Sequence, residues 1–341
     1  MNLLLISPLL FSINENTRYA GIERLVAEYA QELVKEHKVT VMGHADSVYA
    51  DGVSLLPTRP VGDIYLQSEV LQYQTYQSYL RKFDVIHDFS HQHLAARYNN
   101  LPTLNIFWHA PSIAQYPKAP YNIIALSQWA KREFRRVYQQ EARYQYSIGI
   151  NTDKYKLSKR HRNDRFLAVA RTGAEKGNLE AALLCHKLGF PLDINSARGP
   201  ELMGQPHTEY ERQVLSLVDG KQIRIWENSM PEPEKIKMMQ TNKALLYITT
   251  SPEVTSHKIQ ECILCGLPVI VPKLGALPEI VTHGVNGFLC ETQEEYIKAV
   301  LSVNKLKPLT IYRESIERFS LVNTVKNYIP LYQDVARGLR W

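Results

Sequence analysis

The stretch from Ala244 to Pro272 reads ALLYITTSPEVTSHKIQECILCGLPVIVP, and its pattern decides the fold class. Residues 244–250 form an apolar run, which predicts a buried strand. Residues 256–265 carry apolar side chains at helical spacing, and Gly266 suits the end of a helix. Residues 268–272 are again apolar and strand-like. A strand, a helix and a second strand in this order are typical of a parallel α/β sheet.

The same alternation extends over almost the whole chain. Earlier strands are predicted at Leu3–Ser7, Lys38–Gly43, Asp84–His87, Thr103–Trp108 and Asn122–Ala125, and later ones at Phe166–Ala170, Leu192–Ser196 and Ile223–Trp226. Between the two series, residues 151–165 are polar and basic, which suits a linker. The sequence therefore predicts two tandem Rossmann-like, doubly wound α/β domains at 1–150 and 151–309. A helical segment at 310–341 is expected to pack back on the first domain.

Composition is that of a globular protein. Of 341 residues, 45% are hydrophobic and 22% charged, which argues against a disordered or fibrous chain. No apolar run approaches the roughly 18 residues that a membrane span requires. Four cysteines, at 185, 262, 265 and 290, are too few and too scattered for a disulfide framework, so we expect core thiols and a cytoplasmic location.

The net charge of +6 is concentrated locally. Residues 131–165 hold eleven Lys and Arg against four Asp and Glu. A helix predicted at 128–140, with Ser127 placed to cap it, carries basic residues on one side and apolar residues on another. Either this helix faces the core with a solvated basic side, or it lies on anionic lipid at the inner membrane face. We expect no nucleic-acid partner.

Three residues of the first domain stand where ligands of parallel sheets bind, beyond the carboxyl ends of strands. Gly21 opens a helix whose free N–H groups favour an anion, unless it is only a turn glycine. His87 and His109 each end a strand, where an imidazole can bond a ligand hydroxyl, or be an ordinary loop residue. His87, His91 and His93 cluster, but their spacing matches no recognisable metal site, and we expect no metal.

The second domain offers two further stretches. Arg171 and Lys176 lie in a glycine-containing loop after a strand, which predicts either a diphosphate clamp or a solvated basic loop. Glu253 precedes the helix at 256–265 and Glu261 lies inside it, so the two carboxylates reach different parts of one ligand, or are a surface pair. Backbone N–H groups near Ser256, His257 and Lys258 would form an anion site at the same helix.

In order along the chain, these motifs resemble the retaining GT-B glycosyltransferases of glycosyltransferase family 4. The matching positions are Gly21, His109, Arg171 with Lys176-Gly177, Glu253 with Glu261, Gly266-Leu267-Pro268-Val269, and Gly275-Ala276-Leu277-Pro278-Glu279. The resemblance implies two domains facing across a cleft. It also implies transfer of a hexose from a nucleoside diphosphate sugar to a hydroxyl acceptor (a glycan, lipid or small molecule), with retention at the anomeric carbon.

The resemblance also implies roles for individual residues. Arg171 and Lys176, with the helix start at residues 256–258, would neutralise the leaving diphosphate, so neither a metal nor a cofactor would be needed. Glu253 would hold hydroxyls of the donor sugar and Glu261 the ribose. His109 would face the reacting sugar, while Gly21 and His87 would serve the acceptor or a phosphate.

Three departures from the family pattern keep alternatives open. Val254-Thr255-Ser256 stands where relatives usually have Pro-Phe-Gly, and Ala276 replaces a second glycine. A glycine found near the nucleobase in many relatives is absent around Asn228. One alternative is a catalytically silent nucleotide-sugar-binding protein, and another is a nucleotide-sugar 2-epimerase.

Overall fold

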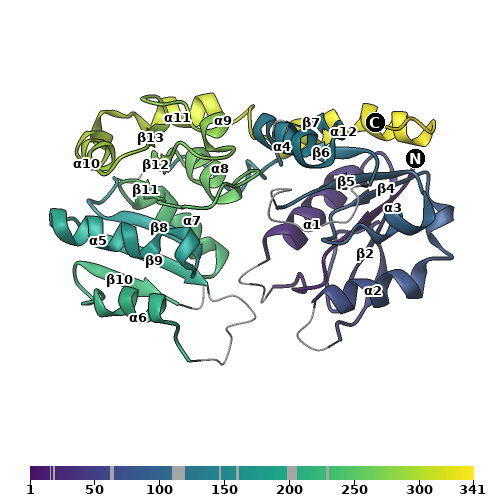
Figure 1. Ribbon diagram of the computed structural model, residues 1–341, viewed down its shortest axis with the longest axis horizontal. Coiled ribbons are helices and arrows are strands. Elements are labelled where there is room, and N and C mark those ends of the chain that lie inside the picture. Colours follow the sequence, from purple (N-terminus) through teal and green to yellow (C-terminus); the bar gives the residue numbers. More distant parts are fainter. Residues whose placement is uncertain are drawn as a thin grey trace. The chain divides into compact units, whose positions relative to one another are not determined.

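The computed structural model describes residues 1–15, 17, 20–61, 65–109, 120–145, 147–158, 161–197, 206–227 and 230–341. The chain divides into two compact units. The first contains Met1–Asn151 together with Ser320–Trp341, and the second contains Thr152–Phe319. Each unit is built on its own sheet, and Figure 1 labels their elements.

In the first unit, the described residues form a seven-stranded parallel sheet in the order β3-β2-β1-β4-β5-β6-β7. Its strands are β1 Asn2–Ile6, β2 Lys38–His44, β3 Ser54–Thr58, β4 Val85–Asp88, β5 Thr103–Ile106, β6 Ile123–Ala125 and β7 Arg143–Tyr144. Its helices are α1 Gly21–Leu33, α2 Tyr65–Tyr76, α3 Leu94–Asn99, α4 Gln128–Tyr138 and α12 Leu321–Ala336, with a 3-10 turn η1 at Leu80–Lys82.

Helix α12 brings the end of the chain into the core of the first unit. It packs against α1, β4 and β5. Its buried apolar residues recur every three or four positions, which places them on one side of the helix: Leu321, Val325, Tyr328, Tyr332 and Val335. The Tyr328 ring meets that of Tyr29 on α1 edge-on, with centroids 5.8 Å apart.

The second unit has a six-stranded parallel sheet among its described residues, in the order β10-β9-β8-β11-β12-β13. Its strands are β8 Phe166–Arg171, β9 Leu192–Ala197, β10 Ile223–Trp226, β11 Leu245–Leu246, β12 Val269–Pro272 and β13 Gly287–Cys290. Its helices are α5 Asn178–Leu188, α6 Glu209–Ser216, α7 Glu232–Thr241, α8 His257–Leu264, α9 Leu277–Ile280, α10 Gln293–Ser302 and α11 Pro308–Ser315, with 3-10 turns η2 Ala174–Lys176 and η4 Val303–Lys305.

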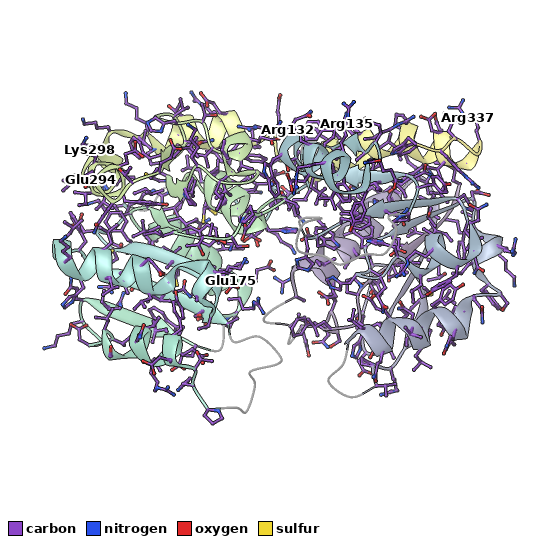
Figure 2. All side chains as sticks on the ribbon, in the orientation of Figure 1. Arg132, Arg135, Glu175, Glu294, Lys298 and Arg337 are labelled. Atoms are coloured by element: carbon purple, nitrogen blue, oxygen red, sulfur yellow. The ribbon has the colours of Figure 1, made fainter. Side chains whose placement is uncertain are left out.

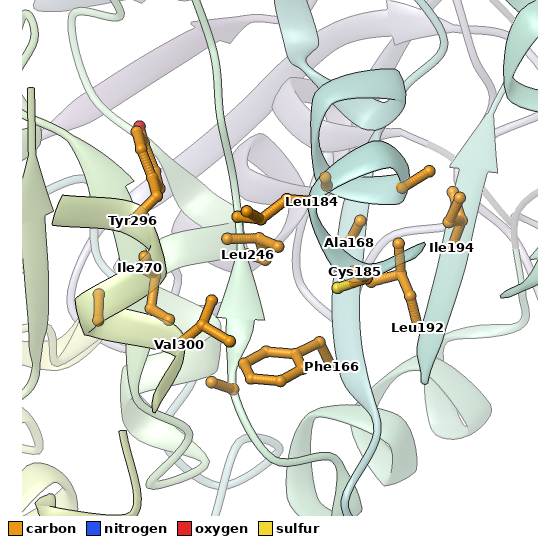
Figure 3. Close-up of a cluster of buried hydrophobic side chains, with 14 of the residues drawn as sticks. Phe166, Ala168, Leu184, Cys185, Leu192, Ile194, Leu246, Ile270, Tyr296 and Val300 are labelled. Atoms are coloured by element: carbon orange, nitrogen blue, oxygen red, sulfur yellow. The ribbon is translucent and has the colours of Figure 1, made fainter. Parts of the chain in front are cut away.

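The core of the second unit joins strand and helix side chains (Figure 3). Phe166 and Leu246 from the sheet pack with Leu184 and Cys185 of α5 and Val300 of α10. All four cysteines of the chain are unpaired and buried. Burial raises the pKa of the Cys185, Cys265 and Cys290 thiols to about 12 each, so these thiols stay protonated at neutral pH.

One segment near the end of the chain differs from the sequence prediction. The terminal helical segment was predicted from residue 310, but α11 lies in the second unit and packs on α8, and the first unit resumes only at Ser320. Residues 284–286 form a turn that leads into β13, which pairs in parallel with β12. This pairing is close, because a Cβ at Gly287 would lie 2.2 Å from the carbonyl oxygen of Val269.

Candidate functional site

Two loops leave neighbouring strands at the carboxyl edge of the second unit's sheet. β8 ends at Arg171 and β11 ends at Leu246, and these strands pair in parallel. The Thr249 hydroxyl and the Thr250 N–H both donate to the carbonyl oxygen of Glu175, at 2.7 and 3.1 Å. Ligands of open parallel sheets bind beyond this edge, so the two loops define a candidate site.

Gly177 allows the two loops to approach each other. Its φ is +74°, in the left-handed region, and a Cβ there would lie 1.9 Å from the carbonyl oxygen of Ile248. All other residue types carry that atom, so the position requires glycine. The close approach places Lys176, the preceding residue, beside the loop that carries Glu253.

The carboxylate of Glu253 is the centre of the site. Its Oε1 accepts a hydrogen bond from Lys176 Nζ at 2.9 Å, and Lys258 Nζ lies 3.7 Å from the same oxygen. The hydroxyl of Tyr247 also donates to Oε1. Burial by itself would raise the pKa of Glu253, but the two ammonium groups and the phenol outweigh it and lower the pKa to about 2. Glu253 is therefore ionised at neutral pH.

A third loop supports the backbone of Glu253. The N–H of Ala276 donates to the Glu253 carbonyl oxygen at 2.9 Å. Gly275 has φ +57°, and a Cβ at that position would lie 2.7 Å from the same carbonyl. The loop singled out by its Gly-Ala-Leu-Pro-Glu sequence thus packs directly on the residue that carries the central carboxylate.

Arg171 stands at the end of β8 and is paired within its own loop. Its Nη2 lies 3.3 Å from Oε1 of Glu175, and the two side chains are 38% and 40% exposed. Figure 2 labels Glu175. The two cations predicted as a clamp are therefore both engaged by carboxylates, Arg171 by Glu175 and Lys176 by Glu253.

The helix α8 begins next to this carboxylate. Ser256 is its N-cap, but its side chain makes no capping hydrogen bond. The Ser256 hydroxyl is buried and has no hydrogen-bond partner among the described residues. Burial lowers the pKa of His257 to about 4, so its imidazole is neutral near pH 7. The first turn of α8 thus offers backbone N–H groups that no serine side chain satisfies.

Glu261 has a separate set of partners. Its Oε2 lies 3.1 Å from Lys235 Nζ on α7, and its Oε1 accepts a hydrogen bond from the Tyr155 hydroxyl at 2.7 Å. The Tyr155 oxygen also lies 3.2 Å from Oε1 of Glu232. Burial opposes ionisation of Glu261, yet Lys235 and Tyr155 together lower its pKa. Both carboxylates are therefore ionised, each beside its own lysine.

Sequence reasoning missed Tyr155, Lys235 and Tyr247. Tyr155 lies in the stretch predicted as a linker, and it is 106 residues away from Glu261 in the chain. Lys235 belongs to an ordinary-looking helix, and Tyr247 to an apolar strand. Tyr247 lies in the middle of the strand predicted at 244–250, whereas β11 ends at Leu246, so the sequence did not show that Tyr247 stands beyond the carboxyl end of the strand, where ligands bind.

The structure contradicts the prediction that His87 serves a ligand. Its imidazole is 1% exposed, and its Nδ1 lies 2.8 Å from the hydroxyl of Tyr332 on α12. The rings of Phe89 and Tyr328 pack against it, with centroids 4.1 and 4.8 Å away. Burial lowers the pKa of His87 to about 3. It is a neutral core residue, which the sequence could not reveal because α12 is more than 200 positions away.

Gly21 and His109 both lie at the surface of the first unit. Gly21 begins α1, and a Cβ there would meet no atom within 4 Å, so close packing does not explain the glycine. The exposed ring of His109 stacks on that of His91, with centroids 5.8 Å apart. Their roles stay predictions. Asn228, near the expected nucleobase position, is outside the described residues.

The described residues include neither a metal-binding cluster nor a membrane-spanning helix. No group of three or more His, Cys, Asp and Glu side chains is arranged to hold a metal ion in the part of the chain that the structure describes. Within the same part, no helix has the length and apolar character needed to cross a membrane.

Known proteins share part of this sequence and its fold. Residues 153–318 match the family described as Glycosyl transferases group 1. The UDP- and glucose-bound Alr3699/HepE from Anabaena has a similar structure, with a TM-score of 0.72 at 17% identity, covering 98% of this chain and 99% of that one. The two parallel-sheet α/β units match the GT-B fold of that structure, so the fold class predicted from the motifs is confirmed, and the similarity of residues 153–318 to the group 1 family agrees with the resemblance seen in the sequence.

Two curated relatives match over shorter regions. N-acetyl-alpha-D-glucosaminyl L-malate synthase from Bacillus anthracis is 26% identical over 132 residues, which cover 36% of this chain and 35% of that protein. A probable sucrose-phosphate synthase from Thermosipho melanesiensis is 28% identical over 195 residues, covering 54% and 43%. The matches thus span less than half the length of either relative.

Proposed function

We propose that this protein transfers a sugar from a nucleoside diphosphate donor to a hydroxyl acceptor, with retention at the anomeric carbon and without a metal. The observation that carries the proposal is the ionised Glu253 carboxylate, held by Lys176, Lys258 and Tyr247 at the carboxyl edge of a parallel sheet. Carboxylates bind sugar hydroxyls well, because each oxygen accepts hydrogen bonds. Beside it, the uncapped start of α8 favours an anion.

In this proposal the residues act mainly on the leaving group. As the bond between the anomeric carbon and the phosphate oxygen breaks, negative charge grows on the diphosphate. Cations fixed nearby stabilise that charge more in the transition state than in the ground state. We assign this role to Arg171, Lys176 and the N–H groups at the start of α8. Glu253 would bind donor hydroxyls, and Glu261 would bind the ribose.

Thermal unfolding with a ligand panel tests the proposal. UDP, GDP, ADP and their sugar conjugates are each added to the protein, and at least one base series is expected to raise Tm. A ligand at 100 times its Kd adds about 2.7 kcal/mol to the stability of the folded state. EDTA is expected to leave sugar transfer unchanged. No rise in Tm with any compound would refute donor binding.

Product analysis separates the alternatives. Transfer to an acceptor, or slow hydrolysis of the donor, supports the proposed activity. Isomerisation of the donor sugar alone would instead identify a 2-epimerase. Binding without transfer, hydrolysis or isomerisation across the donor panel would identify a silent nucleotide-sugar-binding protein.

We also propose that α4 is a contact for an anionic membrane surface. Ser127 caps α4 by accepting a hydrogen bond from the Ala130 N–H at 3.0 Å, and Ala130 and Phe134 are buried. On the other side, Arg132 and Arg135 are exposed, and Figure 2 places both along the margin of the first unit. Such a helix presents positive charge to anionic lipid while its apolar side anchors it to the protein.

Vesicle flotation tests this contact. The protein is expected to float with phosphatidylglycerol-containing vesicles at low salt. Because each basic residue near the surface contributes about 1 kcal/mol, the double variant Arg132→Gln/Arg135→Gln should weaken binding roughly 30-fold. Lys298→Gln/Lys305→Gln, which removes two exposed charges from the second unit, is the matched control. Equal binding by all three proteins would end the membrane proposal.

A further inference from the structure

Two ammonium groups share a single carboxylate oxygen at the candidate site. Lys176 Nζ and Lys258 Nζ lie 2.9 and 3.7 Å from Oε1 of Glu253, and the two lysine side chains are only 20% and 19% exposed. Two positive charges thus face one negative charge in a largely desolvated setting. Tyr247 adds a hydrogen-bond donor and no negative charge. The group as a whole favours a further anion.

Lys258 is held in place by more than its distant ion pair. Its Nζ lies 3.9 Å from the centroid of the Tyr247 ring, which is within the range of a cation–π contact. Tyr247 is itself fixed, because its side chain is buried and its hydroxyl donates to Glu253. An ammonium group has three N–H donors, and a 3.7 Å contact leaves it able to bind another oxygen. Its position is therefore preorganised.

Two features of the residues around Lys258 also favour an anion at this place. Lys258 lies in the first turn of α8, where the helix dipole favours negative charge. The buried hydroxyl of Ser256, two residues earlier, has no hydrogen-bond partner among the residues described. Lys258 also lies two residues after Ser256, which stands where proteins with this motif usually have a glycine. A side-chain cation at this point of the loop can bind a phosphate oxygen directly.

We propose that the side chain of Lys258 is a direct ligand of the donor diphosphate, in addition to Arg171 and Lys176. This inference rests on the proposed function and deepens it, because it assigns the ammonium group and not only the backbone N–H of this residue. On donor binding, a phosphate oxygen would take the N–H groups that Glu253 leaves unused. Lys258 would then help set the affinity for the diphosphate relative to the nucleoside.

Calorimetry with Lys258→Met tests the assignment. UDP, GDP and ADP are each titrated alongside uridine, guanosine and adenosine. For the base that the wild type binds, the variant is expected to bind the diphosphate at least tenfold more weakly and the nucleoside unchanged. Lys258→Arg should retain most of the diphosphate affinity, since it keeps the charge. Lys273→Met, which removes an exposed lysine paired with Glu291, is the matched control.

Each outcome decides the matter. An unchanged diphosphate affinity in Lys258→Met would overturn the assignment and leave the proposed function standing. Equal losses for diphosphate and nucleoside would show that Lys258 only supports the structure of the site, and would also overturn it. If the wild-type protein binds none of the diphosphates, the proposed function itself fails and this inference fails with it.

Discussion

Replacing Arg171 with alanine is expected to lower turnover by about 10²-fold or more, the loss typical of one preorganised charge contact to a developing anion. The guanidinium stands at the end of β8 and is oriented by Glu175, whose Oε1 lies 3.3 Å from it. A planar guanidinium can bind two phosphate oxygens at once, and this geometry has no substitute in alanine. The readout is kcat for transfer, or for donor hydrolysis if the acceptor is unknown.

Two further variants sharpen this test. Arg171→Lys keeps the charge but loses the planar fork, so its kcat is expected to lie between those of wild type and Arg171→Ala. Arg212→Ala removes an exposed arginine of α6 that pairs with Glu209, and should leave kcat unchanged. Wild-type turnover in Arg171→Ala would count heavily against the diphosphate role.

Gly177→Ala is expected to destabilise the second unit by about 3 kcal/mol or more. The new Cβ would lie 1.9 Å from the carbonyl oxygen of Ile248, a contact that forces the loops apart. A residue with a Cβ also pays about 1 to 2 kcal/mol for the left-handed backbone at φ +74°. The free energy of unfolding is measured by urea titration.

Gly189→Ala measures the backbone part of this effect, so that the steric part is the difference between the two variants. Gly189 has nearly the same φ, +73°, but a Cβ there would meet no atom within 4 Å. Its cost should therefore be only that of the backbone conformation, about 1 to 2 kcal/mol. Equal losses of stability in the two variants would show that a Cβ at residue 177 does not clash with the carbonyl oxygen of Ile248.

Much of the fold was predictable because the spacing of apolar residues indicates which side of a strand or helix is buried. The strand ending at Arg171 and the helix beginning after Ser256 were both predicted close to their observed bounds. The order of the motifs also predicted the similarity to glycosyltransferases that residues 153–318 show. The two glutamates could be located by their spacing, since Glu253 precedes α8 and Glu261 lies within it.

The partners of those glutamates were not predictable. Hydrogen bonds such as that between Tyr155 and Glu261 join residues far apart in the chain, and nothing in the local pattern of either residue indicates the other. The prediction for His87 was wrong for the same reason. The local sequence around a histidine at the end of a strand is the same whether its side chain faces a ligand or, as here, the hydroxyl of Tyr332. Tertiary contacts decide between the two.

The division of the chain has a consequence for biosynthesis. The second unit is one continuous segment, whereas the first needs both Met1–Asn151 and Ser320–Trp341. During synthesis from the N-terminus, the sheet of the first unit therefore emerges long before Tyr328 and Tyr332 of α12, which bury His87. The second unit can complete its core in the meantime. All residues of the second unit are therefore synthesised before α12, whereas the packing of α12 on α1, β4 and β5 of the first unit can form only after it.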